Sequence, residues 1–168
     1  MQTKEQFELA KAFEKLFSGL QRGYGLLHGD VYRYVKGQPT TELYQQHLEG
    51  KISLGIVPIT DKGNCRFGAL DLDDHHKKPE GYKFDYNTLL KKIKFLKLPL
   101  TVFESKSGGA HCYLFLDQYY TADNVRHILK KYSYILFRSY IYIYIILLLR
   151  GGGYIEEYKS AQTKSLQI

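Results

Sequence analysis

The sequence contains no tryptophan, one methionine, four prolines and only two cysteines among its 168 residues. Cys65 and Cys112 each lack the close cysteine neighbour that a zinc site or a redox motif needs. Two distant thiols exclude a disulfide framework and suit a reducing compartment, so we expect the protein in the cytoplasm. No apolar leader opens the chain, and the apolar run at 141–149 is shorter than the ~20 residues of a membrane span. We therefore expect neither a secreted nor a membrane protein.

Acidic residues are outnumbered, because 17 Asp and Glu stand against 24 Lys and Arg, which gives a formal net charge of +7. A basic surface favours a polyanionic partner, but a moderate and diffuse excess of charge points to nucleic acid only weakly. The length fits one domain with its own hydrophobic core. The function therefore has to be sought in the motifs.

Hydrophobic periodicity predicts an α+β fold with a mixed or antiparallel sheet and packed helices. The expected helices are 4–21, 41–47, 85–96 and 121–132, and the expected strands are 26–35, 52–59, 66–72, 100–104 and 111–116. Glycines 19, 23 and 25 are expected to end the first helix, and Thr121 or Asp123 to cap the last. We expect the strands at 52–59 and 66–72 to form a hairpin, and residues 117–120 to form a turn.

The strand at 66–72 ends in acidic residues. Alternation along a strand directs Asp71 and Asp73 to one face, and Leu70 and Leu72 to the other, into a core. Two carboxylates ~7 Å apart on one face can hold one divalent cation or bridge two. Carboxylate oxygens are the ligands that Mg2+ and Mn2+ prefer. The pair by itself does not decide between a metal site and a solvated turn.

A glycine-bearing loop joins the strands at 100–104 and 111–116. Glycines let the backbone approach a ligand closely, and their amides can bind phosphate oxygens. The candidate nucleotide-binding residues of this hairpin are Lys106, Ser107, Gly108, Gly109 and His111. A glycine hairpin or a lone histidine is usually structural. Together with the acid pair, however, this hairpin describes a site for a metal ion and a triphosphate.

Residues 54–58, 67–74 and 104–115 together resemble the archaeo-eukaryotic primase superfamily, and most closely the primase-polymerases of mobile elements and conflict systems. The first motif of that family has two aspartates separated by one residue, which match Asp71 and Asp73. The histidine that ends its second motif matches His111. The resemblance covers about residues 26 to 130.

The resemblance implies a DNA primase or polymerase that builds a nucleic-acid strand from nucleoside triphosphates on a single-stranded or primed DNA template. It implies two divalent metal ions, Mg2+ or Mn2+, and a triphosphate contacted by His111. The implied fold is an RRM-like catalytic core packed on an N-terminal α/β unit. We expect an amphipathic helix at 1–25, the core at 26–135 and an atypical segment at 136–168. The resemblance leaves open which helicase or nuclease partner the protein serves.

The chain departs from the family pattern in the second and third motifs, and these departures bear on whether its set of catalytic residues is complete. Gly109 replaces the small hydroxyl residue that commonly stands two positions before the histidine, and Ser107 is the nearest hydroxyl. The third motif, an apolar residue followed by a metal-binding acid, is not plainly present. Asp117 comes too early in the chain and Asp123 is better explained as a helix cap. Glu156 is then the remaining candidate metal ligand, with a solvated turn as the alternative.

Three functions stay open from the sequence. The chain is a primase-polymerase, a catalytically incomplete relative that binds nucleic acid or a nucleotide, or a metal-dependent nuclease built on the same acids. The change in composition after residue 136 suits a truncated or frame-shifted reading frame, which a genomic sequence continuing into an apolar-Asp motif would support. Candidate nucleic-acid contacts are Tyr32, Arg33, Lys91, Lys92 and Lys94.

Overall fold

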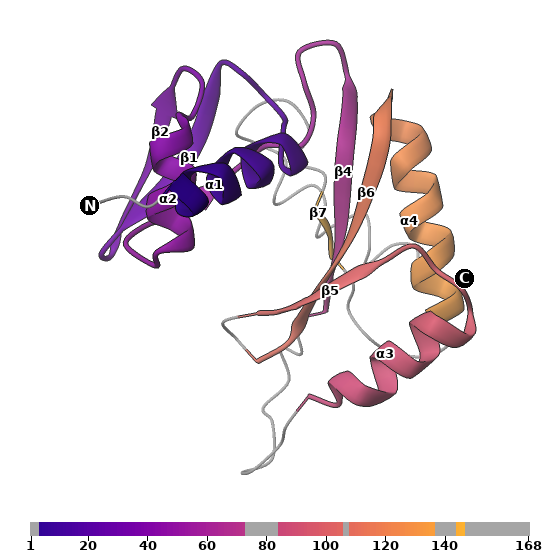
Figure 1. Cartoon of the computed structure of the whole chain (residues 1–168). Helices are drawn as coiled ribbons and strands as arrows, with labels where there is room; N and C mark the ends of the chain where they lie inside the picture. The colour runs from indigo at the N-terminus through magenta and orange to yellow at the C-terminus, as the bar shows by residue number, and fades with distance from the viewer. Residues whose placement is uncertain (1–3, 73–83, 106–107, 137–143, 147–168) are drawn as a thin grey trace.

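The computed structural model describes residues 4–72, 84–105 and 108–136, together with the backbone of 144–146. Within these residues it contains four helices and two antiparallel sheets, which confirms the predicted α+β class (Figure 1). The helices are α1 (Lys4–Leu16), α2 (Thr41–Leu48), α3 (Tyr86–Phe95) and α4 (Ala122–Leu136). None of them is both long and apolar enough to cross a bilayer.

The two sheets are built from different parts of the chain. The three-stranded sheet has the order β2-β1-β3, with β1 at Gly23–His28, β2 at Val31–Lys36 and β3 at Ser53–Gly55. The four-stranded sheet has the order β5-β6-β4-β7, with β4 at Asn64–Leu72, β5 at Thr101–Glu104, β6 at Ala110–Thr121 and β7 at Tyr144–Ile146. All neighbouring strands run antiparallel.

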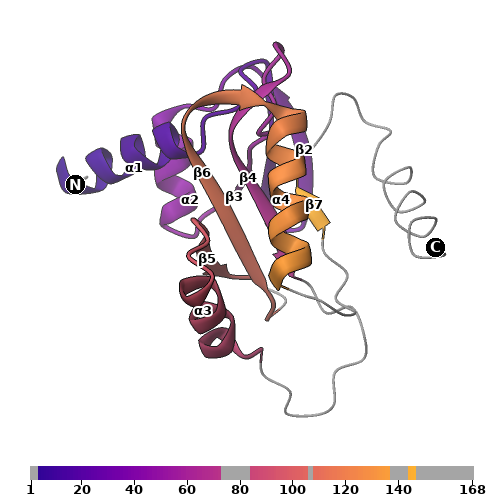
Figure 2. The same cartoon turned by 90° about the vertical axis from the view of Figure 1, so that its right-hand side faces the viewer.

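The central pair β4–β6 has a separate core on each of its faces. On one face, Leu70, Leu72 and Cys112 pack against Ile93 of α3 and Leu129 of α4. The other face carries aromatic side chains that pack on α1 and α2. This aromatic cluster contains Ala10, Phe17, Tyr44 and Phe67, with Phe13, Leu54, Ile56, Tyr113 and Phe115 packed against it. Figures 1 and 2 show the two pairs of helices on opposite sides of β4–β6.

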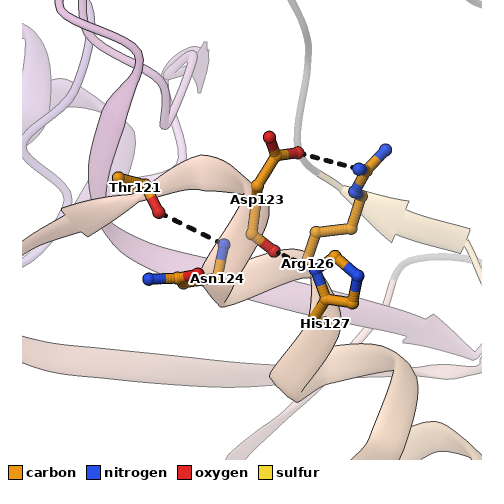
Figure 3. Close-up of polar contacts among 5 residues, drawn as sticks. All are labelled: Thr121, Asp123, Asn124, Arg126 and His127. Carbon is orange, nitrogen blue, oxygen red and sulfur yellow. Dashed lines mark hydrogen bonds and ion pairs between the residues drawn. The ribbon is translucent and has the colours of Figure 1, made fainter.

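The start of α4 is fixed by its own side chains (Figure 3). The backbone N–H of Asn124 donates to Thr121 Oγ1 over 3.4 Å, so Thr121 is the cap of this helix. Asp123 lies in the first turn and forms an ion pair with Arg126 over 2.8 Å, while His127 Nδ1 lies 2.8 Å from the Asp123 carbonyl oxygen. Of the two predicted caps, Thr121 is therefore the one observed.

The predicted hairpin between 52–59 and 66–72 is wrong, because β3 pairs with β1 in the other sheet. The chain leaves β3 after Gly55, and Pro58 has no N–H to continue a ladder. The Val57 carbonyl instead accepts a hydrogen bond from the Leu20 backbone over 2.8 Å. A Cβ atom on Gly19 would lie 2.1 Å from that carbonyl oxygen, so the close approach of the two segments requires glycine.

Three other boundaries differ from the expected ones. The predicted strand at 26–35 is two strands, which turn at Gly29 with a positive φ of 59°. The expected turn at 117–120 lies inside β6, which continues past a bulge to pair with the start of β4. Helix α1 ends at Leu16, and the glycines at 23 and 25 that were expected to end it belong to β1.

Replacing Phe17 by alanine tests the aromatic cluster. Phe17 is 8% exposed, and its ring centroid lies 5.2 Å from those of Phe67, Tyr113 and Phe115. We expect Phe17→Ala to lower the free energy of unfolding by about 3–5 kcal/mol, because it leaves a cavity between α1 and the sheet. The measurement is chemical denaturation. Phe95→Ala is the control, since Phe95 is 85% exposed, and equal losses in both variants would contradict the prediction.

Candidate functional site

Antiparallel pairing brings Asp71 and His111 together. The two residues are direct partners in the β4–β6 ladder, so their side chains leave the same face of the sheet. His111 Nε2 lies 3.2 Å from Asp71 Oδ1, and the two side chains are 31% and 16% exposed. Leu70 and Leu72 lie in the core on the opposite face, as alternation predicts. The acidic end of β4 and the histidine near the start of β6 therefore face each other.

The Asp71 carboxylate is a partly buried negative charge. Its Oδ1 atom is buried and accepts no hydrogen bond from any residue that the structure describes, although His111 Nε2 lies 3.2 Å away. Burial, and to a smaller extent the Asp71 carboxylate, raises the pKa of the Cys112 thiol to about 12. The same two causes raise the pKa of the Tyr113 hydroxyl. A carboxylate oxygen of this kind suits a hard cation.

The ligand set around Asp71 is only partly described. Asp73, predicted on the same face, lies outside the described residues, as do Lys106, Ser107 and Glu156. On the side of β4 away from β6, the register partner of Asp71 is Tyr144 of β7, and the described part of that strand contains no acid. Over the described ranges, no three potential ligands from His, Cys, Asp and Glu gather into a metal-binding group.

Neither Asp117 nor Asp123 can complete the same site. Asp117 lies six residues along β6 from His111, which is ~20 Å at the rise of a strand. Asp123 follows the far end of β6, where Thr121 pairs with Asn64, and forms its ion pair with Arg126 (Figure 3). Both residues therefore lie away from Asp71 and His111, although for other reasons than the sequence suggested, because Asp117 is inside β6 and Thr121 is the cap of α4.

The hairpin between β5 and β6 is closed by its own hydrogen bonds. Ser105 N–H donates to the Gly109 carbonyl over 2.9 Å, and Gly108 N–H donates to the Ser105 carbonyl over 3.0 Å. Gly109 N–H donates to Ser105 Oγ over 3.3 Å. Both described glycine amides are thus already occupied, so in this arrangement they are not directed at a phosphate, as the sequence had suggested.

Tyr86 is a residue of this hairpin that the sequence did not reveal. Its hydroxyl, at the start of α3, donates to the Gly109 carbonyl over 2.6 Å, two residues before His111. Burial, together with the nearby Glu104, raises the pKa of Tyr86, so the phenol keeps the proton that it donates. A tyrosine that opens an amphipathic helix has no sequence signal that separates this contact from ordinary packing.

The predicted nucleic-acid contacts are not gathered around Asp71. Lys91, Lys92 and Lys94 lie on α3, which packs against the opposite face of the sheet. Lys92 Nζ also donates to the Leu136 carbonyl at the end of α4. Tyr32 and Arg33 are adjacent on β2, so their side chains leave opposite faces of that strand. Nucleic-acid binding by these residues stays a prediction.

Comparison with known protein families gives a match to the central part of the chain. The family model described as the archaeo-eukaryotic primase domain of the TOTE conflict system matches residues 33–138, more than half of the chain. The matched range includes β4 and β6 and therefore both Asp71 and His111. A comparison with curated proteins finds no match.

Tyr86→Phe tests whether α3 holds the hairpin. The change removes one hydrogen bond to the Gly109 carbonyl and keeps the ring, so we expect the free energy of unfolding to fall by about 0.5–1.5 kcal/mol. Amide hydrogen exchange should become faster at Gly109 and His111. Tyr134→Phe is the matched control, because Tyr134 is 72% exposed. If amide exchange at Gly109 and His111 is the same in Tyr86→Phe as in the wild type, the hydrogen bond from Tyr86 does not stabilise the hairpin.

Proposed function

The chain belongs to the archaeo-eukaryotic primase domain family of the TOTE conflict system, and on this premise we propose that it adds nucleotides from nucleoside triphosphates to a strand on a DNA template. The observation that supports this most directly is the pairing of Asp71 with His111 across β4 and β6. The pairing puts a carboxylate, a type of group that can bind a cation, beside an imidazole, which can donate to a phosphate.

We assign Asp71, with Asp73 on the same predicted face, to hold Mg2+ or Mn2+. The buried Asp71 oxygen without a hydrogen-bond donor fits this role. A bound divalent ion would stabilise the negative charge that phosphoryl transfer concentrates on oxygen. Glu156 remains the candidate third ligand from the sequence alone.

His111 is assigned to bind the triphosphate. Its imidazole lies at the mouth of the hairpin and is 31% exposed, so a phosphate oxygen can reach a ring N–H. Because the Gly108 and Gly109 amides are occupied within the hairpin, phosphate binding here depends on side chains. We propose that Lys106 and Ser107 supply the other contacts.

The negative charges of Asp71 and of the triphosphate make a metal ion necessary for nucleotide binding. A triphosphate is repelled by the Asp71 carboxylate unless a cation lies between them, and the repulsion is strong where water is partly excluded. The cation is therefore needed for binding as well as for chemistry.

Calorimetric titration with ATP tests this site. We expect the wild type to bind ATP only with Mn2+ or Mg2+ present, and Asp71→Asn to weaken that metal dependence, because the repelling charge is gone. His111→Ala should weaken binding about 10- to 100-fold in the presence of metal, as expected for a hydrogen bond to a charged group. Asp71→Ala should abolish primer extension.

His127→Ala is the matched control for His111→Ala, since His127 is exposed on α4. Equal ATP affinity with and without metal in the wild type would refute the metal assignment. Equal affinity in wild type and His111→Ala would refute the phosphate assignment.

A catalytically incomplete relative that binds nucleic acid is the second candidate. It is supported by the net charge of +7 and by Lys91 and Lys94, which are exposed on α3. Salt-sensitive DNA binding without incorporation at any metal concentration would select it. Degradation of labelled DNA without triphosphates would instead select the nuclease. The division of the chain at residues 25 and 135, a cytoplasmic location and a helicase or nuclease partner stay predictions.

A further inference from the structure

Two tyrosines stand exposed on the edge strand of the N-terminal sheet. Tyr32 and Tyr34 of β2 are 72% and 55% exposed. They are two residues apart, so both leave the same face of the sheet, ~7 Å from each other along the strand. Lys36, two residues further on, shares this face and is exposed. Arg33 leaves the other face.

Glycines lie under both rings. A Cβ atom on Gly23 would lie 1.8 Å from the Tyr34 hydroxyl oxygen, and one on Gly25 would lie 2.6 Å from that of Tyr32. Gly55 of β3 pairs with Gly25, so a third residue without a side chain extends the same face. Each tyrosine ring therefore packs with one side on the backbone of a glycine and is exposed to solvent on the other side.

The opposite face of this sheet is the one turned to the protein core. Arg33 pairs with Leu26, and Leu26 pairs with Leu54, so these three residues share a face. Leu54 packs against the aromatic cluster of α1 and α2. The tyrosine face thus points away from the body of the protein and is open to a partner.

We propose that Tyr32 and Tyr34 form a stacking platform for the unpaired bases of single-stranded DNA, with Lys36 facing the phosphates. Stacking on tyrosine tolerates any base, because every base has a π-face, whereas the bases of a duplex are already stacked on one another. The positive side chain of Lys36 complements the strand, as does the net charge of +7. The inference rests on the proposed function, because the strand bound here would be the template for the proposed nucleotide addition.

A purely structural role for the same rings is the competing explanation. Aromatic side chains that lie over glycine in a neighbouring strand stabilise a sheet by covering its backbone. This role predicts that removing a ring lowers stability and leaves DNA binding unchanged. The two explanations therefore differ in what a ring deletion changes.

Fluorescence anisotropy with a labelled oligothymidine of about 20 nucleotides tests the proposal. We expect Tyr32→Ala and Tyr34→Ala each to weaken binding about 5- to 100-fold. The slope of log affinity against log salt should stay unchanged in both, because tyrosine carries no charge. Lys36→Ala should reduce that slope by about one unit.

Two further sets of variants make the result decisive. Tyr32→Leu and Tyr34→Leu keep an apolar side chain over the glycines, so their melting temperature should stay that of the wild type while their DNA affinity falls. Tyr32→Phe and Tyr34→Phe keep the aromatic ring, so their DNA affinity should stay that of the wild type. Tyr134→Ala is the matched control, because Tyr134 is also 72% exposed but lies on α4. Wild-type affinity in the leucine variants would overturn the proposal.

The test separates this inference from the proposed function. If ATP fails to bind the wild type while the tyrosine variants still lose DNA affinity, the nucleotide site is wrong and the platform stands. If ATP binds as proposed and the leucine variants bind DNA normally, the platform is wrong and the nucleotide site stands.

Discussion

The register of the β4–β6 ladder is the constraint on which the rest of the structure depends. It puts Asp71 directly opposite His111 and, in the same pairing, Leu70 opposite Cys112 in the core. A shift by one residue would send an ionisable side chain to the face covered by α3 and α4, and a leucine to the site. The hydrophobic effect that packs α3 and α4 on this sheet therefore also fixes the candidate site, and no separate interaction is needed to align its two strands.

Much of this arrangement could be predicted from local patterns. Alternation in 66–72 was enough to separate Asp71 from the leucines beside it, because side-chain direction in a strand repeats every two residues. The partner of β3 could not be predicted in this way. Strand pairing depends on contacts distant in sequence, and the Leu20 hydrogen bond to Val57 that diverts the chain has no local signal. The same holds for Tyr86, whose contact with Gly109 depends on how α3 packs.

Glycine shows why residue type alone misleads. Gly23 and Gly25 follow an amphipathic helix, where glycine commonly marks a terminus, yet they form the strand under Tyr34 and Tyr32. In the hairpin at 105–109 the glycines suggest amides that point at phosphate. The described amides instead donate to Ser105, so phosphate binding at this hairpin would depend on side chains. In both places the sequence located the glycines, and their role followed from the neighbouring strand or side chain.

The two candidate surfaces lie on different sheets, so their cooperation requires a rigid connection. The chain passes between the sheets through residues 56–63, a segment that contains neither helix nor strand. The aromatic cluster joins the two sheets directly, because Phe17 contacts rings on both β4 and β6 while Leu54 of β3 packs against the same cluster. Each edge-to-face pair adds about 0.5–1.5 kcal/mol beyond the area that it buries. A template held on one sheet could then stay in register with a nucleotide held on the other, because aromatic packing joins the two sheets in addition to the connecting backbone.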